Sequence, residues 1–79
     1  MDSAEIVRQL AVRYGSLDYD GAITYFHAHE ADLDDVALVP ALLQAFYSAR
    51  DAGRTADAQL FAQRIAVEHP DMPSIQKFL

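Results

Sequence analysis

Two stretches of the chain decide its fold: YDGAITYF at Tyr19–Phe26 and TADAQLFA at Thr55–Ala62. Ala22 in the first stretch and Ala58 in the second are 36 residues apart. Each stretch has apolar residues three and four positions apart, which is the spacing of one face of an α-helix. These residues are Tyr19, Ala22, Ile23 and Phe26 in the first stretch and Ala58, Phe61 and Ala62 in the second, whose pattern continues beyond it with Ile65 and Ala66. A period in the mid-thirties made of paired helices is typical of a helical solenoid.

The segment before Tyr19–Phe26 predicts the partner helix of a first hairpin. Its apolar stripe is Val7, Leu10, Ala11 and Tyr14. Ser3 is expected to cap this helix, and Gly15 is expected to end it in a left-handed conformation. Asp18 is a good N-cap for the helix that follows.

A second hairpin is expected around Gly53, a natural helix stop. The main part of its first helix should begin near Val39, because Pro40 is tolerated in the first turn and costly deeper inside. The alternative is an earlier turn at Asp34–Leu38, with a bend at the proline. Thr55 is expected to cap the second helix, and Pro70 is expected to end it. A short capping helix is expected to follow, with its apolar residues on one side: Met72, Ile75, Phe78 and Leu79.

The chain resembles the tetratricopeptide-repeat family, most closely in its second repeat. The first-helix pattern of that family is matched by Leu42, Ala45, Phe46 and Ala49. Gly53 matches the family's turn, Ala58 its small contact residue and Pro70 its closing proline. The first repeat matches less well, because its turn is one residue short and Asp34 stands near the place of the closing proline.

The resemblance implies an all-α fold in which antiparallel helix hairpins form a right-handed superhelix. Repeat one spans about 3–34, repeat two about 38–70 and the capping helix about 72–79. The first helices of such repeats line a concave groove that binds a peptide or a partner helix. The positions that would face this groove are Arg8, Val12, Leu43, Tyr47 and Arg50. Leu43 and Tyr47 are equally compatible with an ordinary place in the core.

The charge of the chain bears on its partners. With a net charge of −6 among 79 residues, the protein is repelled by the phosphate backbone, which disfavours nucleic-acid binding. No Lys or Arg occurs between Tyr14 and Ala49, whereas six acidic residues do: Asp18, Asp20, Glu30, Asp32, Asp34 and Asp35. This region is either a solvated acidic ridge or a docking face for a basic partner.

The sequence contains no motif that indicates an enzyme, a cofactor or a metal site. His27 and His29 are two residues apart, and a helix turns about 200° over that spacing, so they cannot bind one ion together. The acidic run at Asp32–Asp35 lacks the glycine and the closing glutamate of a calcium loop. The three glycines are scattered and form no phosphate-binding loop.

The leading hypothesis is a protein-interaction module that acts as an adaptor, a small chaperone or a structural subunit. The Lys and Asn residues with which chaperone-binding family members hold a terminal carboxylate are missing, which argues against a chaperone adaptor. Because two repeats bury little apolar surface, self-association or assembly into a complex is expected. The alternative is an acidic bundle that resembles acyl carrier proteins and docks a basic partner. It would lack the attachment serine, because Asp32 stands in its place.

The location of the protein is expected to be cytoplasmic, without contact to a membrane. No apolar run approaches the roughly 20 residues that span a bilayer. The acidic start of the chain, Met1–Glu5, also lacks the apolar core of a signal peptide.

Overall fold

The computed structural model describes residues 1–79 and consists of helices and their connections, without strands. The first hairpin is formed by α1 (Ser3–Gly15) and α2 (Tyr19–His29), and the second by α3 (Asp35–Asp51) and α4 (Thr55–Ala66). The 3-10 helix η1 (Glu30–Asp32) follows α2, and a second one, η2 (Pro73–Phe78), follows α4. The predicted all-α fold of helix hairpins is therefore confirmed.

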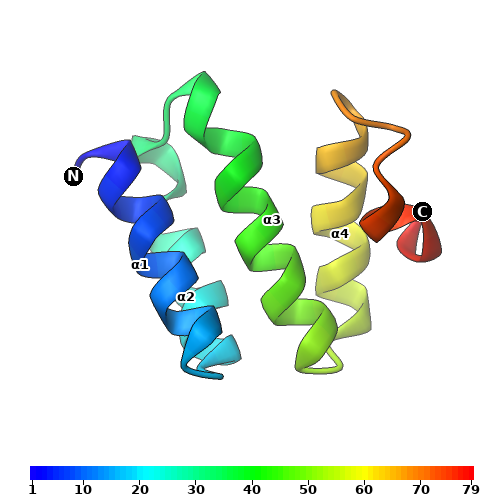
Figure 1. Cartoon of the computed structure of the whole chain (residues 1–79), viewed down its shortest axis with the longest axis horizontal. Coiled ribbons are helices and arrows are strands. Elements are labelled where there is room, and N and C mark those ends of the chain that lie inside the picture. Colours follow the sequence, from blue (N-terminus) through cyan, green and yellow to red (C-terminus); the bar gives the residue numbers. More distant parts are fainter.

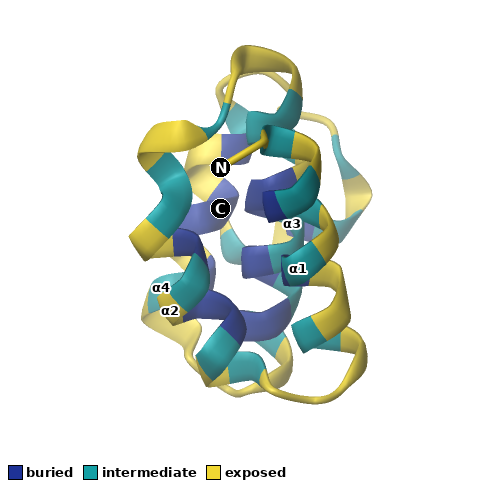
Figure 2. Ribbon diagram, turned by 90° about the vertical axis from the view of Figure 1, so that its left-hand side faces the viewer, coloured by how far each residue is buried: buried dark blue, intermediate teal, exposed yellow.

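In Figure 1, α1, α3 and α4 stand side by side, and α2 lies behind α1. Seen from the side, α1 and α3 lie in one layer and α2 and α4 in the other, with the buried residues turned towards the space between them (Figure 2). Fifteen buried apolar side chains form a single cluster there. None of the helices combines the length and the apolarity required to cross a lipid bilayer.

The two hairpin turns have the same backbone at an offset of 36 residues. Each connection has three residues, Ser16–Asp18 in the first and Ala52–Arg54 in the second. The middle residue is left-handed in both turns, with φ of 63° at Leu17 and 74° at Gly53. The third residue has φ and ψ of −89° and 68° in the first turn and −85° and 74° in the second. The expectation that the first turn is one residue short is therefore wrong.

The hydrogen bonds and the core follow the same offset. The amides of Asp18 and Arg54 each donate to the carbonyl five residues earlier, at 2.9 Å. The buried residues in register are Ile6 with Leu42 and Leu10 with Phe46. The predicted stripe of α1 missed this register: it omitted Ile6, which is fully buried, and included Ala11, which is exposed.

The third helix begins earlier than its proline suggested. α3 starts at Asp35 rather than near Val39, because the Asp34 carboxylate accepts a backbone N–H three residues later at 2.8 Å and caps this turn. Pro40 lies inside the helix and removes the hydrogen bond that its own N–H would donate to the Val36 carbonyl. Since this turn is exposed, water can bind that carbonyl in place of the amide.

The start of α1 is capped by Asp2 instead of Ser3. The Asp2 carboxylate accepts the backbone N–H of Ala4 at 3.2 Å. The Ser3 hydroxyl is used elsewhere: it donates to the Asp32 carbonyl at 3.1 Å and accepts the Asp34 N–H at 3.0 Å. Ser3 thus ties the start of the chain to the connection between the hairpins.

The helix caps at the two turns differ although the backbones agree. The Asp18 carboxylate accepts the N–H of Gly21 at 3.1 Å, as expected of an N-cap. A Cβ atom at Gly21 would overlap this carboxylate, so the glycine makes room for the cap. Arg54 stands at the equivalent place in the second turn and provides no side-chain cap. The expected cap at Thr55 is wrong, because Thr55 is the first residue of α4.

The C-terminal segment covers α4, as a 3-10 helix of six residues. Its Ile75 is fully buried in the core cluster. The Phe78 ring lies edge-on to Phe46 of α3, with centroids 5.3 Å apart. Leu79, which was expected on the same apolar side, is 55% exposed.

Candidate functional site

Three of the five predicted partner-binding residues lie together on α3. Leu43, Tyr47 and Arg50 are four and three residues apart, so they share one stripe of the helix. All three are half-buried. The guanidinium carbon of Arg50 lies 5.0 Å from the centre of the Tyr47 ring, within the range of a cation–π contact.

Arg8 and Val12 lie on another side of α1 and do not join this stripe. Each is two residues from the fully buried Leu10, and two residues correspond to a rotation of about 200° around the helix. Arg8 is exposed and forms an ion pair with Glu5, whose pKa is lowered by its hydrogen bonds from Arg8 and then Gln9. Val12 is 50% exposed.

Tyr14 of α1 completes the surface instead. Its ring lies 5.7 Å from that of Tyr47, and its hydroxyl donates a hydrogen bond of 2.6 Å to Asp51 Oδ2. Arg50 donates from Nε to Asp51 Oδ1 at 2.8 Å and from Nη2 to the Tyr14 hydroxyl at 3.4 Å. We refer to Tyr14, Tyr47, Arg50 and Asp51 as the tyrosine–arginine cluster.

The charges of the tyrosine–arginine cluster compensate one another. The hydrogen bonds from Arg50 and Tyr14 hold the pKa of the Asp51 carboxyl below its ordinary value. The Asp51 carboxylate accepts a hydrogen bond from the Tyr14 hydroxyl. This hydrogen bond raises the pKa of the hydroxyl, with burial as the next cause. The pKa of Arg50 is raised by its hydrogen bond to Asp51. The cluster therefore presents two aromatic rings and a guanidinium that are already held in place.

Sequence reasoning found this surface only in part. It placed Tyr14 in the core stripe of α1, and the contact with Tyr47 depends on how α1 and α3 cross. Asp51 carried no signal, because an acidic residue before a helix-ending glycine is ordinary. The face is also not hollowed at the predicted groove: the five surface depressions of the molecule are lined by other residues.

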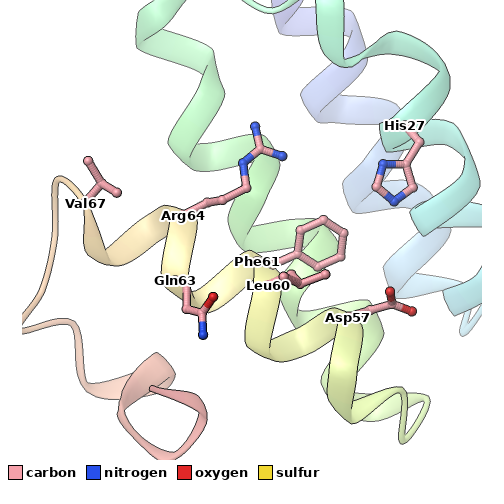
Figure 3. A pocket seen from close by; sticks show the side chains of 7 residues that line it. All are labelled: His27, Asp57, Leu60, Phe61, Gln63, Arg64 and Val67. Atoms are coloured by element: carbon pink, nitrogen blue, oxygen red, sulfur yellow. The ribbon is translucent and has the colours of Figure 1, made fainter.

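A depression that sequence reasoning did not predict lies between α2 and α4 (Figure 3). It has a volume of about 360 Å³, and its accessible lining is mostly apolar. The residues that line it are His27, Asp57, Leu60, Phe61, Gln63, Arg64 and Val67. Leu60 and Val67 are seven residues apart and lie outside the buried stripe of α4, a signal that the sequence did contain.

Two of the three histidines, His27 and His29, contact aromatic rings. The His27 ring stacks on Phe61 with centroids 5.8 Å apart, and the His29 ring lies 4.2 Å from that of Tyr25. No group of three or more His, Cys, Asp or Glu side chains is arranged to hold a metal ion.

Comparison of the chain with family models, with curated proteins and with solved structures gave no match.

Proposed function

We propose that this chain is a protein-interaction module of the tetratricopeptide type, an adaptor or a structural subunit that binds a partner peptide or helix on the α1–α3 face. The observation that carries the proposal is the tyrosine–arginine cluster. Tyr and Arg are enriched among the residues that dominate protein interfaces. Here they are half-buried. Tyr14 and Arg50 are fixed by hydrogen bonds, and the Tyr47 ring contacts both of them, so little side-chain entropy is lost on binding.

The repeated turn also supports a repeat module and favours it over a carrier-like bundle. Equal backbones at an offset of 36 residues indicate two copies of one structural unit. This unit is two residues longer than the 34 residues of the tetratricopeptide repeat. In that architecture the first helices, which correspond to α1 and α3, form the binding face of a right-handed superhelix.

Binding would combine apolar contact with aromatic anchoring. Leu43 adds an apolar side chain next to Tyr47 on the same stripe of α3. Because Arg50 is already paired with Asp51, the face carries little net charge, and a partner bound there should show little dependence on salt.

The test is site-specific photo-crosslinking in the native host. A photoreactive phenylalanine analogue at position 47 should capture a defined protein, while the same analogue at the exposed Thr24 of α2 should not. Binding of that purified protein should weaken at least tenfold in Tyr47→Ala and stay unchanged in Thr24→Ala. Equal capture at both positions, or unchanged binding by Tyr47→Ala, would show that the face has no such role.

The oligomeric state provides a second measurement. Light scattering over a dilution series tells whether the face is free or covered by a second copy. A dimer that dissociates in Tyr47→Ala would identify the partner as another copy of this chain. A monomer leaves the face free for a different protein.

A further inference from the structure

A second surface on the opposite layer of the molecule is built around Arg64. Three neighbouring depressions, of about 360, 430 and 190 Å³, all include this residue in their lining. The first and second also share His27, the second and third share Leu38, and the first and third share Val67. They therefore form one continuous strip over α2, the start of α3 and α4, which we call the Arg64 strip.

The apolar part of the Arg64 strip is larger than the fold requires. Leu60 is 59% exposed and Val67 is 82% exposed, although α4 already has a complete buried face. In Figure 3, Leu60 lies next to Phe61 in the middle of the depression, and Val67 lies towards the end of α4. The strip continues into Leu33, Leu38 and Val39. Exposed apolar residues that are contiguous in this way mark interaction sites.

The charged residues of the Arg64 strip are mostly acidic. Its lining contains three carboxylates, Glu30, Asp57 and Glu68, and one cation, Arg64. Arg64 is neutralised by an ion pair with Glu30. Asp57 shares the cation Arg54 with Asp20, which leaves the surroundings negative. A second copy of this chain, with its net charge of −6, is therefore a poor occupant.

We propose that the Arg64 strip docks a basic amphipathic helix of a partner protein. The apolar side chains of such a helix, spaced by three, four and seven residues, would contact Leu60 and Phe61 of α4 and Val67, the residue that follows it, over a length of about two helical turns. Its Lys and Arg residues would face Glu68, Asp57 and Glu30 at the edges. The long-range attraction to the acidic chain increases the rate of association, and the apolar contact sets the register.

The test uses two synthetic helical peptides of 14 residues that share one leucine face and differ in the polar face, lysine in one and glutamate in the other. The lysine peptide is expected to bind the full chain, with amide shifts in the nuclear magnetic resonance spectrum at His27, Leu60, Arg64 and Val67. The affinity of the lysine peptide should fall at least tenfold in the double variant Leu60→Ser/Val67→Ser, which changes only exposed side chains and leaves the core intact. It should also fall at least tenfold when the salt concentration is raised from 50 to 500 mM. The glutamate peptide should bind at least tenfold more weakly.

Val12→Ser is the matched control, because it removes an exposed apolar side chain from α1; it should leave the affinity unchanged. Tyr47→Ala should do the same, which separates this proposal from the function proposed for the α1–α3 face. The proposal is overturned if the serine double variant binds the lysine peptide as well as the original chain does. It is equally overturned if both peptides bind alike, or if the double variant abolishes a dimer in light scattering, since the occupant would then be a second copy.

Discussion

The two hairpins of this protein make the same turn with different residues. In the second, Gly53 occupies the left-handed position and Arg54 leaves the next helix without a side-chain cap. In the first, Leu17 adopts the left-handed conformation and Asp18 caps the next helix. The first hairpin thus combines a strained residue with a strong cap, and the second combines an unstrained residue with no cap. Backbone geometry is shared, while the stabilising contributions are distributed differently.

The largest difference is expected at the outer ends of the hairpins. Ile75 of η2 is fully buried, so Ile75→Ala should lower the free energy of unfolding by about 3 kcal/mol. Arg8, on the outer side of α1, is exposed and pairs only with a neighbour on its own helix. Arg8→Ala should leave the free energy of unfolding nearly unchanged, because an exposed ion pair contributes little. Urea unfolding followed by circular dichroism measures the free energy of unfolding of both variants. Equal losses in the two variants would show that the packing of η2 does not stabilise the second hairpin.

The left-handed positions should respond in opposite directions. Gly53→Ala forces a side chain into a φ of 74° and should cost about 1–2 kcal/mol, although no atom stands in its way. Leu17→Gly should raise the free energy of unfolding by about 0.5 kcal/mol, because the relief of backbone strain in the folded state outweighs the added conformational freedom of the unfolded chain. The Leu17 side chain is 71% exposed, so little packing is lost. Thermal unfolding of both variants decides this, and a loss of stability in Leu17→Gly would contradict it.

The effects of substituting Asp18, the cap in the first turn, and Gly21, whose N–H it accepts, should not be additive. Asp18→Ala is expected to cost about 1 kcal/mol. Gly21→Ala should also destabilise the protein, because the new Cβ displaces the Asp18 carboxylate. When Asp18 is already alanine, the same change should instead stabilise the helix by about 0.5–1 kcal/mol through helix propensity. The four proteins of this double-mutant cycle are compared by urea unfolding, and additive effects would refute the coupling.

The smallest effect is expected where the two hairpins meet, at Asp51. The folded-state pKa of Asp51 is lowered, so its contribution to stability is present above the unfolded pKa of about 4 and is lost as the pH falls through the folded value. Asp51→Asn should therefore cost about 0.5 kcal/mol at pH 7, a low value because the pair is partly exposed, and less at pH 2. Urea unfolding at both pH values tests this, with Tyr14→Phe as the variant that removes both hydrogen bonds of the tyrosine hydroxyl and keeps the ion pair between Arg50 and Asp51. A cost of Asp51→Asn that did not shrink at pH 2 would rule out this role.

Local chemistry made parts of the fold predictable. Asp18 was recognised as a cap and Gly53 as a stop because each residue type has a backbone preference of its own. The buried stripe of α4, from Ala58 to Ile65, was predicted correctly because its spacing is regular.

Other features depend on tertiary structure and could not be found in this way. A leucine gives no indication of a left-handed turn, so the first turn was misjudged and the core register of α1 was shifted past Ile6. Pro40 appeared to mark the start of the main helix, and an earlier turn at Asp34–Leu38 was left as an alternative. The cap at Asp34, which makes that turn part of α3, could not be established from the sequence. Of the predicted site, Leu43, Tyr47 and Arg50 were indicated by the resemblance to the tetratricopeptide-repeat family, and their spacing does place them on one stripe of α3. The contact between Tyr14 and Asp51 requires the packing of α1 on α3.

The common offset of 36 residues has a consequence for how such a chain could grow. It aligns Ile75 and Phe78 of η2 with Val39 and Leu42 of α3, so the short terminal helix stands where the first helix of a third hairpin would begin. If a further hairpin were inserted before η2, its first helix would pack against α4. η2 would then pack against the second helix of the inserted hairpin. In the proposed repeat architecture the chain would be extensible in whole units, and each added unit would lengthen both the face that carries the tyrosine–arginine cluster and the layer that carries the Arg64 strip.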